Sequence, residues 1–273
     1  MRFLVAGGLS VQRACLLASL ARATFRYQAH PDDNSELVSQ VRELAARYPR
    51  YGYRRITALI RQRHLVNHKP VRRIWRREGL QVGRIRHMRA RRSRPQPLQA
   101  TYPGDIWAYD FVEDSLSSGV SFKVLTVMDE FTREGLALDV APSTSAERVI
   151  GVLTTLVAQH GAPAHLRSDN GAEFVAHTVQ FWLAQAGVRT LYIEPGKPWQ
   201  NGKEERFNGT VRDECLNRYV FGSFAEACVR LARFRQEYNT ERPHSALGYL
   251  TPQAFRVAWA EAQKNQQDPL IST

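Results

Sequence analysis

A single acidic residue inside an apolar run constrains this chain more than any other feature. The run IWAYDFV covers 106–112 and is apolar on both alternating faces except at Asp110. This pattern predicts a strand that is buried on both sides. An unpaired, ionised carboxylate in such a strand is strongly destabilising, so Asp110 needs a cation or a proton. The nearby Glu113 and Asp114 lie toward the strand end, where exposure to solvent explains them.

Two later acids have spacing and settings that fit the same chemistry. Asp169 stands in HLRSDNGAEF, at the carboxyl end of a short predicted strand. Ligands of α/β sheets collect at that end, although Asp-Asn-Gly is equally good turn chemistry. Glu205 follows after 35 intervening residues, inside a predicted helix. If these two acids meet Asp110 in space, the three carboxylates form a site for Mg²⁺, which prefers oxygen ligands.

The predicted helix at 198–216 presents several polar groups on one face. Arg212 follows Glu205 by seven residues, which returns it to within about 20° of the same direction at about 100° per residue. Asn201, one turn earlier, is expected on that face as well. Glu204 is expected to point elsewhere, as a solvated acid. The face then offers a metal ligand beside groups for DNA, whereas an ordinary charged surface helix is the alternative.

The charge of the chain is unevenly distributed. Its net charge is +12, but residues 1–100 carry 22 Lys or Arg against 5 Asp or Glu, whereas residues 101–273 carry 16 against 21. In the basic part every cation except Lys69 is an arginine, which suits bidentate contacts with phosphate. This distribution favours nucleic-acid binding by the first part. The alternative is an arginine-rich surface that is merely solvated.

The basic part divides into three predicted regions. Residues 1–30 form a short helical segment with Ser10 as a possible N-cap, either a small helix-turn-helix or a packing hairpin. Residues 31–82 contain three helices at helical apolar spacing, and the last of them is basic. Such a helix suits insertion into a DNA groove, although a solvated charged face is the alternative. Residues 83–100 form an Arg-rich linker that is expected to become ordered on phosphate. The candidate DNA contacts in these regions are Arg72, Arg73, Arg76, Arg77, Arg84, Arg86, Arg91 and Arg92.

The remaining chain alternates strands and helices. Strands are predicted at 105–113, 121–129, 135–141, 164–168 and 189–193, and helices at 145–160, 176–186, 198–216 and 223–238. The close spacing of the first three strands predicts an antiparallel meander. The order βββαβαβ predicts an α/β domain with a mixed five-stranded sheet and flanking helices. We expect this core to span 101–262 and to be followed by a disordered tail at 263–273.

Cysteine use and hydropathy place the chain in a reducing, aqueous compartment. Cys15, Cys215 and Cys228 form no CxxC pair, which argues against a disulfide framework. No apolar run reaches the roughly 18 residues of a membrane span, and the apolar start lacks a cleavage site, so a cytoplasmic location without membrane contact is expected. His64 and His68 have a spacing seen in metal sites, but no CxxC follows, so no zinc is expected.

These motifs together resemble the D-D-E catalytic core of transposases and retroviral-type integrases, which has an RNase H-like fold. The likeness extends over nearly the whole chain to the OrfB proteins of the bacterial insertion-sequence family named after insertion sequence 3. WAYDFVED, SDNGAEF and PGKPWQNGKEERFNGTVRDECLN are similar to its three catalytic blocks, and YNTERPHSALGYLTPQAF to its C-terminal signature. The resemblance implies that Asp110, Asp169 and Glu205 are catalytic metal ligands and that Arg212 contacts the DNA end.

The resemblance also implies a mechanism and partners. Two Mg²⁺ ions roughly 4 Å apart, replaceable by Mn²⁺, would serve cleavage of double-stranded DNA at the element's ends and strand transfer into a target. A nucleoid-associated homo-oligomer on DNA is expected. OrfA, which brings another helix-turn-helix and a leucine zipper, is an expected partner by fusion or association. Two alternatives stay open: a catalytically inactive DNA-binding accessory protein or remnant that needs OrfA, and a structure-selective nuclease without strand transfer.

Overall fold

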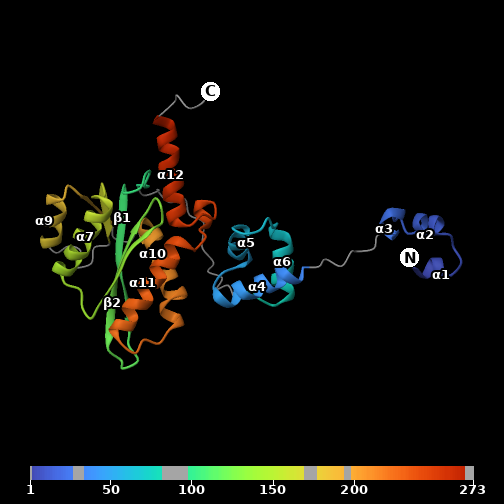
Figure 1. Cartoon of the computed structure of the whole chain (residues 1–273), viewed down its shortest axis with the longest axis horizontal. Coiled ribbons are helices and arrows are strands. Elements are labelled where there is room, and N and C mark those ends of the chain that lie inside the picture. The colour runs from blue at the N-terminus through green and yellow to red at the C-terminus, as the bar shows by residue number, and fades with distance from the viewer. Residues whose placement is uncertain (1, 27–33, 82–97, 169–176, 194–197, 268–273) are drawn as a thin grey trace. The chain divides into compact units, whose positions relative to one another are not determined.

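The computed structural model describes residues 2–26, 34–81, 98–168, 177–193 and 198–267 of the chain (Figure 1). By its contacts the chain separates into two compact units, Met1–Glu43 and Leu44–Thr273. The division between the units falls within the helix Ser35–Arg47. The sequence predicted a boundary near residue 30, a position that lies outside the described residues.

The first unit contains short helices. Ser10 caps the second of them, because its hydroxyl accepts a hydrogen bond of 3.3 Å from the amide of Arg13, as predicted. Ala14 and Cys15 are buried in this small region. The helices are α1 (Arg2–Ala6), α2 (Val11–Leu17), α3 (Arg22–Arg26) and α4 (Ser35–Arg47), of which the last crosses into the second unit.

The second unit begins with a helical pair. Helices α5 (Tyr53–Arg61) and α6 (His68–Arg77) pack against one another through apolar stripes at helical spacing. Ile56 on α5 and Trp75 on α6 are both buried. Asn67 caps α6, as its side chain accepts from the amide of Lys69 at 3.3 Å. The pattern-based prediction of helices here is therefore confirmed.

A mixed five-stranded sheet forms the centre of the second unit. Its strands are β1 (Ile106–Ser115), β2 (Ser121–Asp129), β3 (Gly135–Ala141), β4 (His165–Ser168) and β5 (Arg189–Tyr192). The strand order is β3-β2-β1-β4-β5. The first three strands form the predicted antiparallel meander, and β4 and β5 join β1 in parallel. In this register Asp110 lies opposite Thr126.

Helices cover both faces of the sheet (Figure 1). They are α7 (Ala146–His160), α9 (His177–Gln185), α10 (Gly202–Glu214) and α11 (Phe224–Thr240), with 3₁₀ turns at Pro198–Asn201, Leu216–Arg218 and Ser245–Leu247. Helix α12 (Pro252–Gln267) packs on α11 and extends beyond the sheet. The tail expected to be disordered from residue 263 is instead helical through Gln267, because α12 continues without a breaker. None of the described helices is long and apolar enough to cross a membrane.

Alternation along β1 directs its side chains into two separate cores. Trp107 and Tyr109 pack with α7 and α9 on one face of the sheet. Ala108 and Val112 pack with α10 and α11 on the other face. Because side chains alternate along a strand, Asp110 faces the same side as Ala108 and Val112. The acid therefore points toward α10 and α11, beneath the helix that carries Glu205.

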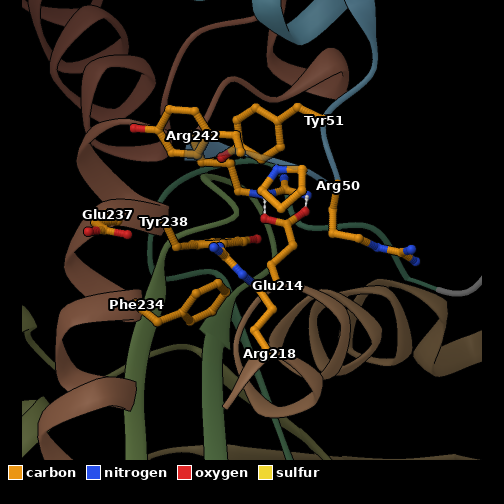
Figure 2. Close-up of a pocket in the computed structure, with 10 residues that line it drawn as sticks. Arg50, Tyr51, Glu214, Arg218, Phe234, Glu237, Tyr238 and Arg242 are labelled. Atoms are coloured by element: carbon orange, nitrogen blue, oxygen red, sulfur yellow. Dashed lines mark hydrogen bonds and ion pairs between the residues drawn. The ribbon is translucent and has the colours of Figure 1, made fainter. Parts of the chain in front are cut away.

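A buried ion pair ties the region around Tyr51 to the sheet-covering helices. The guanidinium of Arg242 makes two hydrogen bonds with the Glu214 carboxylate, at 2.9 and 2.8 Å (Figure 2). It also lies 5.9 Å from the ring centroid of Tyr51 and 5.3 Å from that of Tyr238. Arg55 of α5 reaches the same carboxylate at 3.6 Å. These contacts fasten α5 to α10 and α11 within the second unit.

Candidate active site

Asp110 occupies the centre of β1, where its carboxylate is half-buried against α10. Its Oδ2 accepts a hydrogen bond of 2.8 Å from the Asn208 amide on α10. Its Oδ1 accepts from the backbone amide of Phe111, also at 2.8 Å. Strand and helix therefore hold this carboxylate in a fixed direction.

Glu204 is not the solvated acid that the sequence suggested. Its side chain is fully buried, and its Oε1 accepts a hydrogen bond of 2.7 Å from the Thr126 hydroxyl on β2. Burial raises the pKa of Glu204 well above its usual value; the Thr126 hydrogen bond opposes this rise, while the charges of Asp110 and Glu130 add to it. The helical period explains the burial, because residue 204 shares a face with the buried Phe207 and Val211.

Glu205 lies about 100° further around α10 and is exposed. Asp110 is hydrogen-bonded to Asn208, which lies one turn beyond Glu205 on the same helix. Asp169, the third member of the expected set, lies outside the described residues, although it follows Ser168, the last residue of β4. The structure therefore places two of the three acids, Asp110 and Glu205, on the adjoining elements β1 and α10.

Arg212 and Asn201 differ in their surroundings. Arg212 is exposed near the end of α10, and its guanidinium donates a hydrogen bond of 2.6 Å to the Glu113 carbonyl of β1. Asn201 is only 6% exposed, in the 3₁₀ turn before α10. Asn201 is thus buried where Glu205 is exposed, and a 3₁₀ turn instead of an α-helical turn precedes Gly202. A DNA contact from either side chain stays a prediction.

A buried cluster of charges beside this helix was missed by the sequence reasoning. Glu130, directly after β2, is 1% exposed. Its carboxylate pairs with Arg167 of β4 at 2.7 Å and with Lys203 of α10 at 3.0 Å. Arg167 also donates to the carbonyls of Gln200 and Leu98, at 3.0 and 2.7 Å. The signal was weak, since Arg167 lies in a short strand whose only apolar residue is Leu166; its burial is what requires a partner for the cation.

This charge cluster fixes the start of α10. Burial lowers the pKa of Lys203, and the Glu130 charge opposes that effect. Through Arg167 and Lys203 a single acid joins β2, β4 and α10. The first turn of the helix is thereby held at the end of β4 that precedes Asp169.

The donor set around Asp110 fits a hard cation. The Glu204 Oε2 and the Asn208 Oδ1 are buried without a hydrogen-bond partner among the described residues. Asn208 is bonded to the Asp110 carboxylate, whose oxygens suit Mg²⁺, whereas Glu204 is bonded to Thr126 and its raised pKa favours the neutral acid. No group of three acidic, His or Cys side chains that could hold a metal occurs among the described residues. The candidate set needs Asp169 to be complete.

The basic helix α6 presents the arginines that the sequence singled out. Arg72, Arg73, Arg76 and Arg77 are all exposed, whereas Val71, Ile74 and Trp75 face inward. The helix therefore separates a packing face from a basic face, as its pattern predicts. Arg84, Arg86, Arg91 and Arg92 of the linker lie outside the described residues.

The sheet and its helices define the class of protein: an RNase H-like core of the integrase type, preceded by a helical region. Residues 32–89 match the HTH-like domain family, and residues 100–198 and 186–252 match two families that are each described as an integrase core domain. The simian T-cell lymphotropic virus intasome, solved with a regulatory subunit of protein phosphatase 2A, shares the fold. The TM-score of this match is 0.52 at 17% sequence identity, and the match covers 79% of this chain and 74% of the intasome chain.

Relatives among insertion-element proteins extend over most of the chain. An uncharacterized 31.7 kDa protein of insertion element IS407 from Burkholderia multivorans is 40% identical over 250 residues, which are 90% of each chain. An uncharacterized 39.2 kDa protein of IS476 from Xanthomonas euvesicatoria is 38% identical, covering 96% of this chain and 76% of that protein. The putative transposase InsK of IS150 from Escherichia coli K12 is 26% identical, covering 88% and 90%. The chain belongs to the family of insertion-sequence transposases named after insertion sequence 3.

Proposed function

We propose that this protein cleaves the DNA ends of an insertion sequence and joins them to a target, with Asp110, Asp169 and Glu205 as its metal-binding acids. The observation that carries this proposal is the half-buried Asp110 carboxylate, which is held toward α10 by Asn208. A strand so apolar has no structural need for an acid. The family relationship and the 35-residue gap from Asp169 to Glu205 support the same assignment.

The residues of this chain have distinct roles in the proposed reaction. Asp110 holds metal with its position fixed by Asn208, and Glu205 completes the set from the exposed side of α10. When bound, two Mg²⁺ ions, or Mn²⁺ in their place, supply activation of the attacking water or 3′-hydroxyl and stabilise the leaving oxygen. Arg212 contacts the DNA end beside them. The Glu130 cluster keeps the first turn of α10 at the sheet, so Glu205 keeps its direction.

DNA binding is assigned to the basic helical region and its linker. Arginine suits this role because its planar guanidinium contacts phosphate with two hydrogen bonds. We propose that double-stranded DNA is bound by a homo-oligomer and that OrfA acts with it by fusion or association. The simian T-cell lymphotropic virus protein of similar fold was solved as an intasome, and the HTH-like match supports a nucleic-acid role.

The direct test is metal-dependent cleavage and joining of duplex DNA that carries the gene's own flanking sequences. Wild-type protein is expected to yield a joined product with Mg²⁺ or Mn²⁺. Asp110→Asn should lower the rate by at least about 100-fold, because one carboxylate of the metal set is removed. Its DNA affinity should stay within about twofold, since the basic region is intact.

The outcomes separate the competing functions. Equal rates for wild type and Asp110→Asn would overturn the site assignment. Binding without any joined product, restored by adding OrfA, would indicate an accessory protein that needs its partner. Cleavage without joining would indicate a nuclease.

A further inference from the structure

A wide groove separates α5 from the C-terminal signature in the second unit. It has a cavity volume of about 740 Å³. One wall carries Arg54, Arg61 and His68, and the other carries Thr240, Tyr249 and Thr251. This volume exceeds that of a single ion or phosphate and is in the range of large ligand sites. The groove opens to solvent, because the three basic side chains are exposed.

The basic side chains that line the groove favour binding of an anionic ligand. Two arginines and a histidine line it, and none of the described residues that line it is acidic. Arg54 is exposed, and its pKa is raised first by Tyr53 and also by Tyr249 on the opposite wall. The Arg61 guanidinium donates through Nε to the Val66 carbonyl at 2.9 Å, which fixes its direction. The Arg54 guanidinium donates through Nε to the Tyr53 hydroxyl at 3.2 Å. Each guanidinium carries further N–H groups, and such groups contact phosphate well.

The groove is continuous with the basic face of α6. The guanidinium of Arg72 lies 5.9 Å from the ring centroid of Tyr53, and that of Arg54 lies 5.8 Å from the same ring. Tyr53 therefore joins the exposed arginines of α6 to the groove. A continuous path of cations fits an extended polyanion better than a small molecule.

Tyr249 stands on the opposite wall in a constrained conformation. Its φ of 68° lies in the left-handed region, which disfavours residues other than glycine. The loop fixes it there, because its amide donates to the His244 carbonyl at 2.8 Å and the His244 amide donates to the Leu250 carbonyl at 3.0 Å. Strain of this kind persists only where the surroundings enforce it. The loop thus presents an aromatic ring opposite the arginines.

We propose that this groove binds the backbone of duplex DNA running on from α6, with Arg54 and Arg61 at phosphates and Tyr249 against a sugar. The assignment rests on the proposed function, which it extends to the C-terminal signature. That signature thereby acquires a role as one wall of a DNA clamp. The contact reads no sequence, because phosphates and sugars are the same at every base pair.

The test compares DNA affinity across salt concentrations for Arg54→Ala/Arg61→Ala and wild type, using fluorescence anisotropy with duplexes of flanking and of random sequence. Two fewer neutralised phosphates should lower the slope of log affinity against log salt by about 2. Affinity should fall about tenfold or more on both duplexes. The control Arg189→Ala/Arg233→Ala removes the same charge at exposed positions outside the groove and should change neither quantity.

A second measurement places the DNA directly. Ala58 lines the groove and Cys228 is exposed, so Ala58→Cys in a Cys228→Ser background can carry a cross-linker. Cross-linking to duplex DNA is expected from position 58, and Tyr249→Leu should reduce it. Unchanged affinity and slope in the double variant, or no cross-link from position 58, would overturn the groove assignment. If wild type itself fails to bind duplex DNA, the proposed function fails, and the groove assignment with it.

Discussion

Two adjacent acids on α10 have opposite environments. Glu204 is buried with its carboxylate on Thr126, while Glu205 is exposed. One residue corresponds to about 100° on a helix, which is enough to turn one side chain into the core and the next one out of it. A shift of one residue along α10 therefore decides which of the two acids is exposed and can act with Asp110.

Glutamine substitutions at these two positions test the assignment. Glu205→Gln should lower the joining rate at least about 100-fold without changing the melting temperature, because the carboxylate it removes is exposed. Glu204→Gln keeps the acceptor for Thr126 and removes a buried acid, so we expect most activity to remain and the melting temperature to stay equal or rise. Joining kinetics and thermal unfolding of both variants measure this. If Glu204→Gln is inactive and Glu205→Gln is active, Glu204 and not Glu205 is the acid that acts with Asp110.

At the scale of elements, the sequence pattern predicted most boundaries, because burial imposes periodicity. The strands match their expected ranges within two residues, and the predicted cap at Ser10 is formed. The region before α10 was not predicted, because Pro198 fits the start of either an α-helix or a 3₁₀ turn. The Glu130 cluster was not predicted either, since an ion pair between three elements depends on the tertiary fold.

The basic face of α6 should account for a large part of the salt dependence of DNA binding. Replacing Arg72, Arg73, Arg76 and Arg77 by Ala should lower the slope of log affinity against log salt, by at most about 0.9 for each phosphate that is no longer neutralised. The matched variant with four Lys keeps the charge and should retain most of the slope, although lysine cannot bind phosphate through a bidentate fork. Anisotropy titrations measure both. An unchanged slope in the Ala variant would place binding elsewhere.

At the scale of the whole molecule, the excess positive charge and the central sheet lie in different parts of the chain. The first hundred residues carry the excess positive charge, and the mildly acidic remainder carries the sheet and the candidate site. The two parts meet within the second unit where Arg55 and Tyr51 contact the Glu214–Arg242 pair. Beside that pair His244 is 8% exposed, and its Nε2 lies 3.4 Å from Arg242 Nη1. A neutral imidazole accepts a hydrogen bond there, whereas a protonated one would repel the guanidinium.

His244 should therefore make stability depend on pH. Burial lowers its pKa to about 3, and the charges of Arg242, Arg55 and Arg133 add to this effect. The unfolded chain binds the proton first, so the free energy of unfolding should fall as pH drops from about 6.5 toward 3, by up to about 1.4 kcal/mol per pH unit. His244→Gln should flatten this dependence, and the exposed His64→Gln should leave it unchanged. Urea unfolding between pH 7 and 5 measures the free energy of unfolding of wild type, His244→Gln and His64→Gln. If this free energy depends equally on pH in all three proteins, the assignment to His244 is contradicted.

Helix α10 has a mechanical consequence. It carries Glu205 near its first turn and Glu214 at its last residue, and Glu214 is the anchor for Arg242 and for Arg55 of α5. Nine residues of unbroken helix, about 14 Å, separate the two acids. In the proposed complex, a displacement of α5 by bound DNA would therefore be transmitted along α10 to Glu205, which would couple DNA binding to cleavage.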